Sequence, residues 1–175
     1  MDVLLGSSPG ERSRDAFFQL YCCFESGVIS ETEFVSRAMN ITGFAGTSEE
    51  LISVWCDIFD PMPGMWDWCA RKKKEGMKLV LFSNTNSLHR ARFFREPVFS
   101  LFDDAVYSDE IGEMKPGNGM YEYAIHKLGV NPTRTIYVDD LEANIETGRR
   151  FGFQCSRFFP DDPITSVARL DAMCR

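Results

Sequence analysis

The feature that most constrains the fold is a change of hydrophobic period near residue 78. From there on, short apolar runs alternate with stretches of helical periodicity. The apolar runs cover 78–82, 104–107, 135–138 and 154–158, and the helical stretches lie near 88–94, 120–128 and 143–151. Continuous apolar strands that alternate with helices predict a parallel sheet covered on both faces and connected by right-handed crossovers. We therefore predict a doubly wound α/β fold for this half of the chain.

The part of the chain before this change has helical periodicity. An S/T-x-x-E pattern begins at Ser30 and another at Thr47. In this pattern the Ser or Thr hydroxyl accepts a hydrogen bond from the backbone amide of the Glu three residues later, and the Glu side chain accepts one from the backbone amide of the Ser or Thr. Two helix starts are therefore expected. A further helix is expected over 65–75. Because there is no internal repeat or low-complexity linker, we predict a small helical cap and N-terminal segment over 1–62 and the α/β core over 63–175.

Composition excludes several classes of protein. The 175 residues are 44% hydrophobic and include 15 Phe, enough for a substantial core. The 26 acidic against 19 basic residues give a net charge of −7, which would repel a nucleic acid. Six cysteines without C-x-x-C spacing indicate reduced thiols in a cytosolic protein. No apolar run has the length of a signal or membrane segment, so we expect a soluble cytoplasmic protein without membrane or nucleic-acid partners.

A polar turn follows the first predicted strand. It begins with Ser83 and Asn84, and ligands of open α/β sheets bind beyond the carboxyl ends of strands. The hydroxyl, the amide and the backbone N–H groups of such a turn can hold an anion. When these two residues are taken alone, ordinary turn and N-cap chemistry is the favoured explanation.

Two adjacent carboxylates, Asp139 and Asp140, follow the predicted strand 135–138. Their repulsion raises the pKa of one of them unless a cation or hydrogen-bond donors compensate. Mg²⁺ suits this role, because it binds through one or two carboxylates plus substrate phosphate. The alternative is that one aspartate caps the next helix and the other points to solvent. Asn144 and Gly148, one and two turns later, predict a helix with a polar start and an inner face packed close to the sheet.

Lys115 lies between these two places, in a loop before a helix. Pro116 disfavours helical geometry at Lys115, and a single lysine in a loop is solvated by default. These polar residues follow one another at the ends of successive α/β units, in the order Ser83, Lys115, then Asp139 and Asp140. This order makes a shared functional site a stronger prediction than any one of the residues does alone.

These residues resemble the motifs of a known family. Ser83 with Asn84 after a strand, Lys115 with Pro116, and the aspartate pair with Asn144 resemble the second, third and fourth motifs of the haloacid dehalogenase superfamily. The strings 82–86 and 138–144, with 24–30 upstream, are similar to its branch of small phosphatases with a helical cap.

The resemblance implies a phosphoryl-transfer site. Ser83 and the amide of Asn84 would hold phosphate oxygens, and Lys115 would neutralise charge between the nucleophile and the phosphate. Asp139, with Asp140 bound directly or through water, would hold Mg²⁺, and Asn144 would support them. Positioning and fixed charge are what phosphoryl transfer mainly requires.

The first motif of the family, an apolar strand that ends in a nucleophilic aspartate, has no counterpart in this chain. Asp2 has no strand before it, and Asp15 lies in a helical context. In the family this strand lies centrally, between those that end here at Phe82 and Val138. We expect the natural protein to begin upstream of Met1; the alternative is that residues 2–5 insert as a surrogate strand.

Two functions follow from the resemblance. The first is Mg²⁺-dependent hydrolysis of a small phosphorylated metabolite through an aspartyl-phosphate, with little or no turnover by residues 1–175 alone. The family also contains dehalogenases, but Asp139 and Asp140 favour a phosphatase. The second is a non-catalytic protein that retains the fold as a binding or interaction module. No pattern in the chain identifies the substrate or the oligomeric state.

Overall fold

The computed structural model describes residues 11–174 except Phe59, Pro61 and Phe94. The expectation for residues 2–5 therefore lies outside the described residues. Within the described part of the chain, no helix has the length and apolar character needed to cross a membrane. The chain divides into two compact units, which we call the helical unit and the α/β unit. The helical unit contains the described residues up to Asp60 and those within 84–96 and 107–114. The α/β unit contains the described residues within 62–83, 97–106 and 115–174.

This division differs from the expected boundary after residue 62. Two segments that the sequence assigned to the α/β core, 84–96 and 107–114, group with the N-terminal helices instead. They carry the turn after the first strand and the short helix after the second. Sequence order alone could not assign them, because each lies inside a run of alternating strands and helices.

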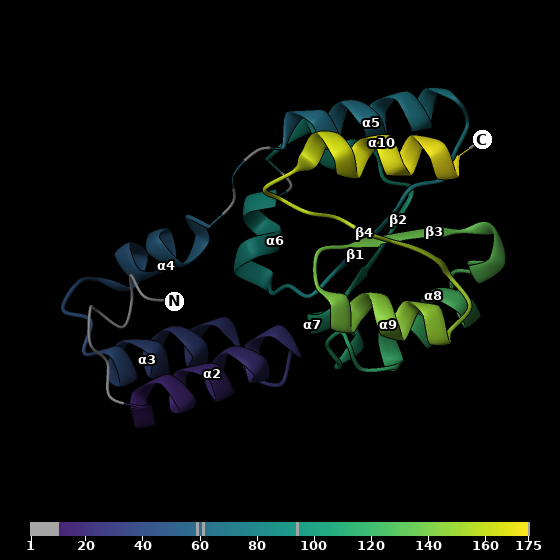
Figure 1. Cartoon of the computed structure of the whole chain (residues 1–175). Helices are drawn as coiled ribbons and strands as arrows, with labels where there is room; N and C mark the ends of the chain where they lie inside the picture. Colours follow the sequence, from purple (N-terminus) through teal and green to yellow (C-terminus); the bar gives the residue numbers. More distant parts are fainter. Residues whose placement is uncertain (1–10, 59, 61, 94, 175) are drawn as a thin grey trace. The chain divides into compact units, whose positions relative to one another are not determined.

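The helical unit confirms both expected helix starts. Ser30 accepts a hydrogen bond from the Glu33 amide, and Thr47 and Glu50 form a complete capping box. An aromatic core holds the helices together, with the rings of Phe24 and Phe34 stacked at a centroid distance of 4.2 Å. Its helices, drawn in Figure 1, are α2 Glu11–Glu25, α3 Glu31–Thr42, α4 Ser48–Cys56, α6 Ser87–Phe93 and α7 Ser108–Ile111.

The α/β unit contains all four predicted strands, each within two residues of the expected bounds. The strands are β1 Val80–Ser83, β2 Asp104–Tyr107, β3 Ile136–Asp139 and β4 Gln154–Arg157. Its helices are α5 Pro63–Lys74, α8 Gly119–His126, α9 Glu142–Arg150 and α10 Pro163–Met173, with 3-10 turns at Pro97–Leu101 and Pro132–Arg134. Strands β3 and β4 are parallel, in a register that pairs Ile136 with Gln154 and Asp139 with Arg157.

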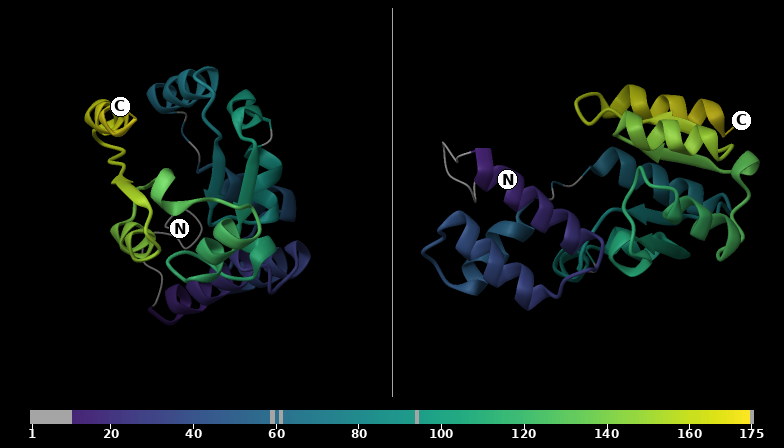
Figure 2. Two further views of the ribbon diagram at one scale, coloured as in Figure 1. Left: turned by 90° about the vertical axis from the view of Figure 1, so that its right-hand side faces the viewer. Right: turned by 90° about the horizontal axis from the view of Figure 1, so that it is seen from below.

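Helices cover both faces of these strands. Figures 1 and 2 show α5 and α10 side by side on one face and α8 and α9 on the other. Alternation along β3 explains this, because successive side chains of a strand point to opposite faces. Ile136 and Val138 pack toward α5 and α10, whereas Tyr137 packs with Tyr121 of α8 and Ile145 of α9. The predicted doubly wound arrangement is thus confirmed.

Among the described residues, the strands form two two-stranded sheets, β1 with β2 and β3 with β4. Side chains connect the two inner strands instead of a backbone ladder. The ring of Phe82 on β1 meets the ring of Tyr137 on β3 edge-on, with centroids 5.5 Å apart.

Gly148 lets α9 lie close against the strands, as its place in the sequence predicted. A Cβ atom at this position would lie 2.5 Å from the Tyr137 ring and 2.9 Å from the Cys155 sulfur. Real Cβ atoms do not approach so closely, so glycine is required here for close helix–strand packing.

Candidate phosphate and metal site

Lys115 is buried at the carboxyl ends of β1 and β3. Its Nζ donates to the backbone carbonyl of Phe82 at 2.7 Å and to Oδ2 of Asp139, also at 2.7 Å. The Lys115 and Asp139 side chains are 8% and 4% exposed. The structure therefore excludes the default of a solvated loop lysine and brings together two of the residues that the sequence singled out.

The carboxylate of Asp139 accepts four hydrogen bonds. Oδ2 accepts from Lys115 and from the Tyr137 hydroxyl at 2.8 Å. Oδ1 accepts from the Leu141 amide and from Asn144 Nδ2, each at 2.9 Å. Burial alone would raise the pKa of Asp139, but the charge of Lys115 and the hydrogen bonds outweigh it and hold the pKa below its usual value. Asp139 is thus an ionised carboxylate enclosed by donors, and Asn144 is one of these donors.

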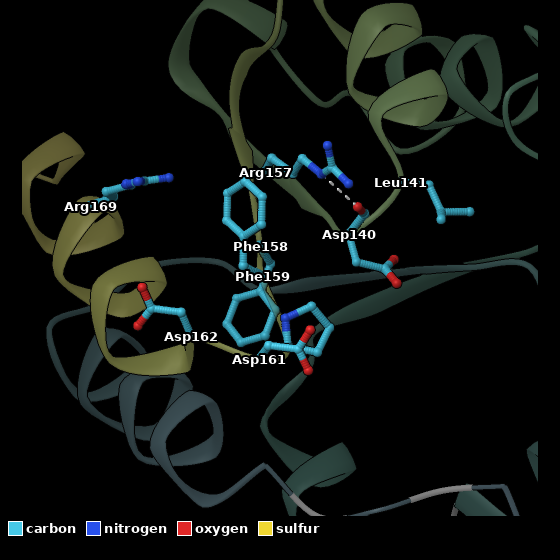
Figure 3. A pocket seen from close by; sticks show the side chains of 9 residues that line it. Asp140, Leu141, Arg157, Phe158, Phe159, Asp161, Asp162 and Arg169 are labelled. Atoms are coloured by element: carbon cyan, nitrogen blue, oxygen red, sulfur yellow. Dashed lines mark hydrogen bonds between the residues drawn. The ribbon is translucent and has the colours of Figure 1, made fainter.

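Asp140 has the opposite environment. Its side chain is exposed, and its backbone carbonyl accepts a hydrogen bond from Arg157 Nε at 2.9 Å. Figure 3 shows the carboxylate directed away from the Arg157 guanidinium, at the border of an open pocket of about 510 Å³. Phe159 and Asp161 also line this pocket. Asp139 ends β3 with an enclosed side chain, whereas Asp140 lies one residue beyond the strand with an exposed side chain, so the two adjacent aspartates do not share one environment.

Ser83 ends β1 in the α/β unit, and Asn84 opens the next segment of the chain. Both are partly exposed, whereas Thr85 and Asn86 are fully buried. The turn is fastened by Ser108, whose Oγ accepts from the Thr85 amide at 2.8 Å and donates to the Thr85 carbonyl at 3.1 Å. The turn after β1 is therefore held by its backbone, with Ser83 and Asn84 at its accessible end.

Sequence reasoning missed a buried network behind this turn. Asn86 Nδ2 donates to Glu25 Oε1 at 2.7 Å and lies 3.1 Å from His89 Nδ1. His89 Nε2 lies 3.1 Å from the Trp55 carbonyl, so it carries the hydrogen and leaves Nδ1 as the acceptor. Asn86 Oδ1 accepts from the His89 amide, which makes Asn86 the N-cap of α6. Glu25 and Asn86 stand in the strings that carry the family resemblance, but no local pattern pairs them.

Burial perturbs both titratable groups of this network. It raises the pKa of Glu25 to about 7, against the lowering effect of the Asn86 hydrogen bond, and it lowers the pKa of His89. Both groups are therefore favoured in their neutral forms inside the helical unit.

The Glu25→Gln variant should change the pH dependence of stability. Because folding raises the pKa of Glu25, its stabilising contribution is complete below about pH 4 and is lost as the pH rises through about 7. Glutamine keeps an acceptor for Asn86 and cannot ionise. We expect the unfolding free energy of the variant, relative to wild type, to rise by about 2 to 3 kcal/mol between pH 5 and pH 8.

Urea unfolding at both pH values measures this effect. The exposed Glu49, changed to glutamine, is the matched control in the same unit and should leave the profile unchanged. Parallel pH profiles for wild type and Glu25→Gln would contradict the prediction.

Comparison with known proteins identifies the family. The model of the haloacid dehalogenase-like hydrolases matches residues 34–152, so the chain belongs to this family. The chain is 26% identical to a D-ribitol-5-phosphate phosphatase of Bacteroides thetaiotaomicron over 87% of its own length and 78% of that protein. It is similar to the structure of a predicted family hydrolase from Porphyromonas gingivalis, with 25% identity, a TM-score of 0.75 and coverage of 89% and 78% of the two chains.

A further structure confirms the fold. It is a family enzyme from Bacteroides thetaiotaomicron solved with magnesium and inorganic phosphate, 20% identical, with a TM-score of 0.73 and coverage of 91% of this chain and 90% of that one. The family and fold predicted from the motifs are confirmed.

Proposed function

We propose that this protein is a phosphatase-type member of the family, which acts on small phosphomonoesters with Mg²⁺ through an aspartyl-phosphate. The observation that carries the proposal is the buried Lys115, fixed between the carboxyl ends of β1 and β3. A fixed cation at this place suits the charge on a transferring phosphoryl group. The relative that acts on ribitol phosphate and the related enzyme that binds magnesium and phosphate support this class of substrate and ion.

Each site residue has a proposed role. The Ser83 hydroxyl and the Asn84 amide bind phosphate oxygens, and Lys115 neutralises charge on the phosphate. Asp140 is the direct Mg²⁺ ligand, because it is the exposed carboxylate, whereas the oxygens of Asp139 already accept four hydrogen bonds. This proposal differs from the expectation from sequence, in which Asp139 binds the metal and Asp140 binds it directly or through water. One carboxylate plus phosphate and water suits Mg²⁺, and the bound ion would polarise the phosphoryl group.

Hydrolysis also needs a nucleophilic carboxylate. Asp139 is enclosed by donors and Asp140 is assigned to the metal, so neither is available for this role. We therefore expect residues 1–175 to bind phosphate and Mg²⁺ and to show little or no turnover.

Calorimetric titration with inorganic phosphate, with and without Mg²⁺, tests this function. Asp140→Asn should weaken the Mg²⁺-dependent binding by about ten-fold or more, which is a loss of about 1.4 kcal/mol. Asp161→Asn is the matched control, because Asp161 is an exposed aspartate of the same pocket (Figure 3), and it should stay within about two-fold of wild type.

Each part of the proposal has a result that would contradict it. The phosphate site is wrong if wild type binds no phosphate, and the metal assignment is wrong if Asp140→Asn binds as wild type does. A robust Mg²⁺-dependent rate on p-nitrophenyl phosphate would refute the expectation of little turnover. Binding without turnover, even when upstream residues are added, would favour the non-catalytic alternative.

A further inference from the structure

Tyr137 contacts the same carboxylate oxygen as Lys115. Its hydroxyl donates to Asp139 Oδ2 at 2.8 Å, and Lys115 Nζ donates to that oxygen at 2.7 Å. Tyr137 and Asp139 are two residues apart on β3, so they project from the same face of the strand. Tyr137 is only 7% exposed, which shields this contact from water.

The direction of the hydrogen bond follows from its partners. The Tyr137 hydroxyl donates its single hydrogen, and Oδ2 of Asp139 accepts it at 2.8 Å. The Tyr121 hydroxyl lies 3.2 Å from the Tyr137 oxygen and 2.9 Å from the carbonyl of Asn144, and it has one hydrogen for these two acceptors. The Tyr137 hydroxyl is thus the donor, and the Asp139 carboxylate the acceptor, of this hydrogen bond.

We propose that Tyr137 is a positioning residue, whose hydroxyl fixes the Asp139 carboxylate and thereby holds Lys115 in the orientation that binds phosphate. Only the last step, the binding of phosphate by Lys115, rests on the proposed function. Oδ2 of Asp139 accepts one hydrogen bond from Tyr137 and one from Lys115. If the Tyr137 hydroxyl is removed, the bond from Lys115 remains. The carboxylate then keeps three hydrogen bonds instead of four, and the position of Oδ2 depends on Lys115 alone, so both side chains gain freedom to shift. A charge-assisted hydrogen bond from a buried hydroxyl resists such a shift.

A role in packing alone is the competing explanation. The Tyr137 ring contacts Phe82 edge-on at 5.5 Å and Phe153 at 5.9 Å, and α9 packs against it at Gly148. Phenylalanine keeps all of these ring contacts and removes only the hydroxyl. Tyr137→Phe therefore separates the hydrogen bond from the packing.

The matched control is Tyr121→Phe. It removes a buried hydroxyl from the same aromatic cluster but keeps the bond between Tyr137 and Asp139. Thermal unfolding of both variants establishes that each is folded. A double variant, Tyr137→Phe in the Asp139→Asn background, tests whether Tyr137 acts through Asp139, because the second change should then add no further effect on Lys115.

Two measurements decide the matter. The first is the ¹⁵N NMR signal of the Lys115 ammonium group, assigned by its disappearance in Lys115→Arg. The second is the affinity for inorganic phosphate with Mg²⁺. We expect Tyr137→Phe to shift or broaden the Lys115 signal and to weaken phosphate binding by about five-fold, with Tyr121→Phe close to wild type in both.

An unchanged Lys115 signal in folded Tyr137→Phe would overturn the proposal, and so would equal effects of the two variants. If Tyr137→Phe does not fold, Asp139→Asn with Tyr137 intact still tests the proposal, since an unchanged Lys115 signal in that variant would contradict positioning of Lys115 through Asp139. A changed Lys115 signal in a protein that binds no phosphate would refute the proposed function and leave the positioning of Lys115 by Tyr137 supported.

Discussion

Replacement of Gly27 by alanine should lower the free energy of unfolding of the helical unit by more than about 3 kcal/mol. Gly27 follows α2 with a φ of +65°, in the left-handed region that side chains rarely adopt. A Cβ atom here would also lie 2.1 Å from the backbone carbonyl oxygen of Asp109. A carbonyl in the chain cannot swing aside as the end of a flexible side chain can, so the backbone itself must move.

Gly43 provides a matched control for this prediction. It has the same φ of +65°, at the C-cap of α3, and a Cβ atom there would meet nothing within 4 Å. Gly43→Ala should therefore cost only the backbone strain, about 1 to 2 kcal/mol. Urea or thermal unfolding of the two variants gives the comparison. Equal losses of unfolding free energy in Gly27→Ala and Gly43→Ala would contradict the prediction, because they would show that the backbone at Asp109 moves aside at little cost.

The Lys115–Asp139 pair should show the second large effect. Lys115→Met leaves the Asp139 charge buried without its cation, and Asp139→Asn leaves the lysine without its counter-charge. Each single variant should lose about 3 to 5 kcal/mol of unfolding free energy, because the remaining charge is buried and unpaired. The double variant Lys115→Met/Asp139→Asn should lose clearly less than the sum of the two, because neither charge remains.

An exposed pair offers the control. Lys78 and Asp104 also form an ion pair, but their side chains are 54% and 37% exposed, so Lys78→Met should cost less than about 1 kcal/mol. Phosphate titration of the same variants separates stability from function, since every variant at Lys115 should lose phosphate binding, including the double variant. Additive losses in the double-mutant cycle would contradict the view that the two buried charges depend on each other.

The two aspartates show why adjacent residues of one motif take different roles. Asp139 is the last residue of β3 and points to the face covered by α8 and α9, where Lys115, Tyr137 and Asn144 meet it. Asp140 lies one residue beyond the strand and faces an open pocket (Figure 3). Their separation removes the repulsion that two carboxylates in one environment would have, and the charge of Lys115 with the hydrogen bonds keeps the pKa of Asp139 below its usual value.

The sequence by itself determined the elements and the family. The apolar runs, the two capping patterns at Ser30 and Thr47, and the ordered motifs at Ser83, Lys115 and Asp139 are local or linear signals. Such signals can be recognised in the amino-acid sequence alone. The strands accordingly begin and end within two residues of their expected bounds. The family match confirms what the motifs indicated.

The tertiary structure alone decided which groups are buried together. Glu25 meets Asn86 across 61 positions of sequence, and Lys115 meets Asp139 across 24. It also encloses Asp139 while leaving Asp140 exposed, and it makes the Tyr137 hydroxyl a hydrogen-bond donor to Asp139, the partner of Lys115. Burial and long-range hydrogen bonds set these roles, and both depend on the packing of distant segments, which no local pattern of residues encodes.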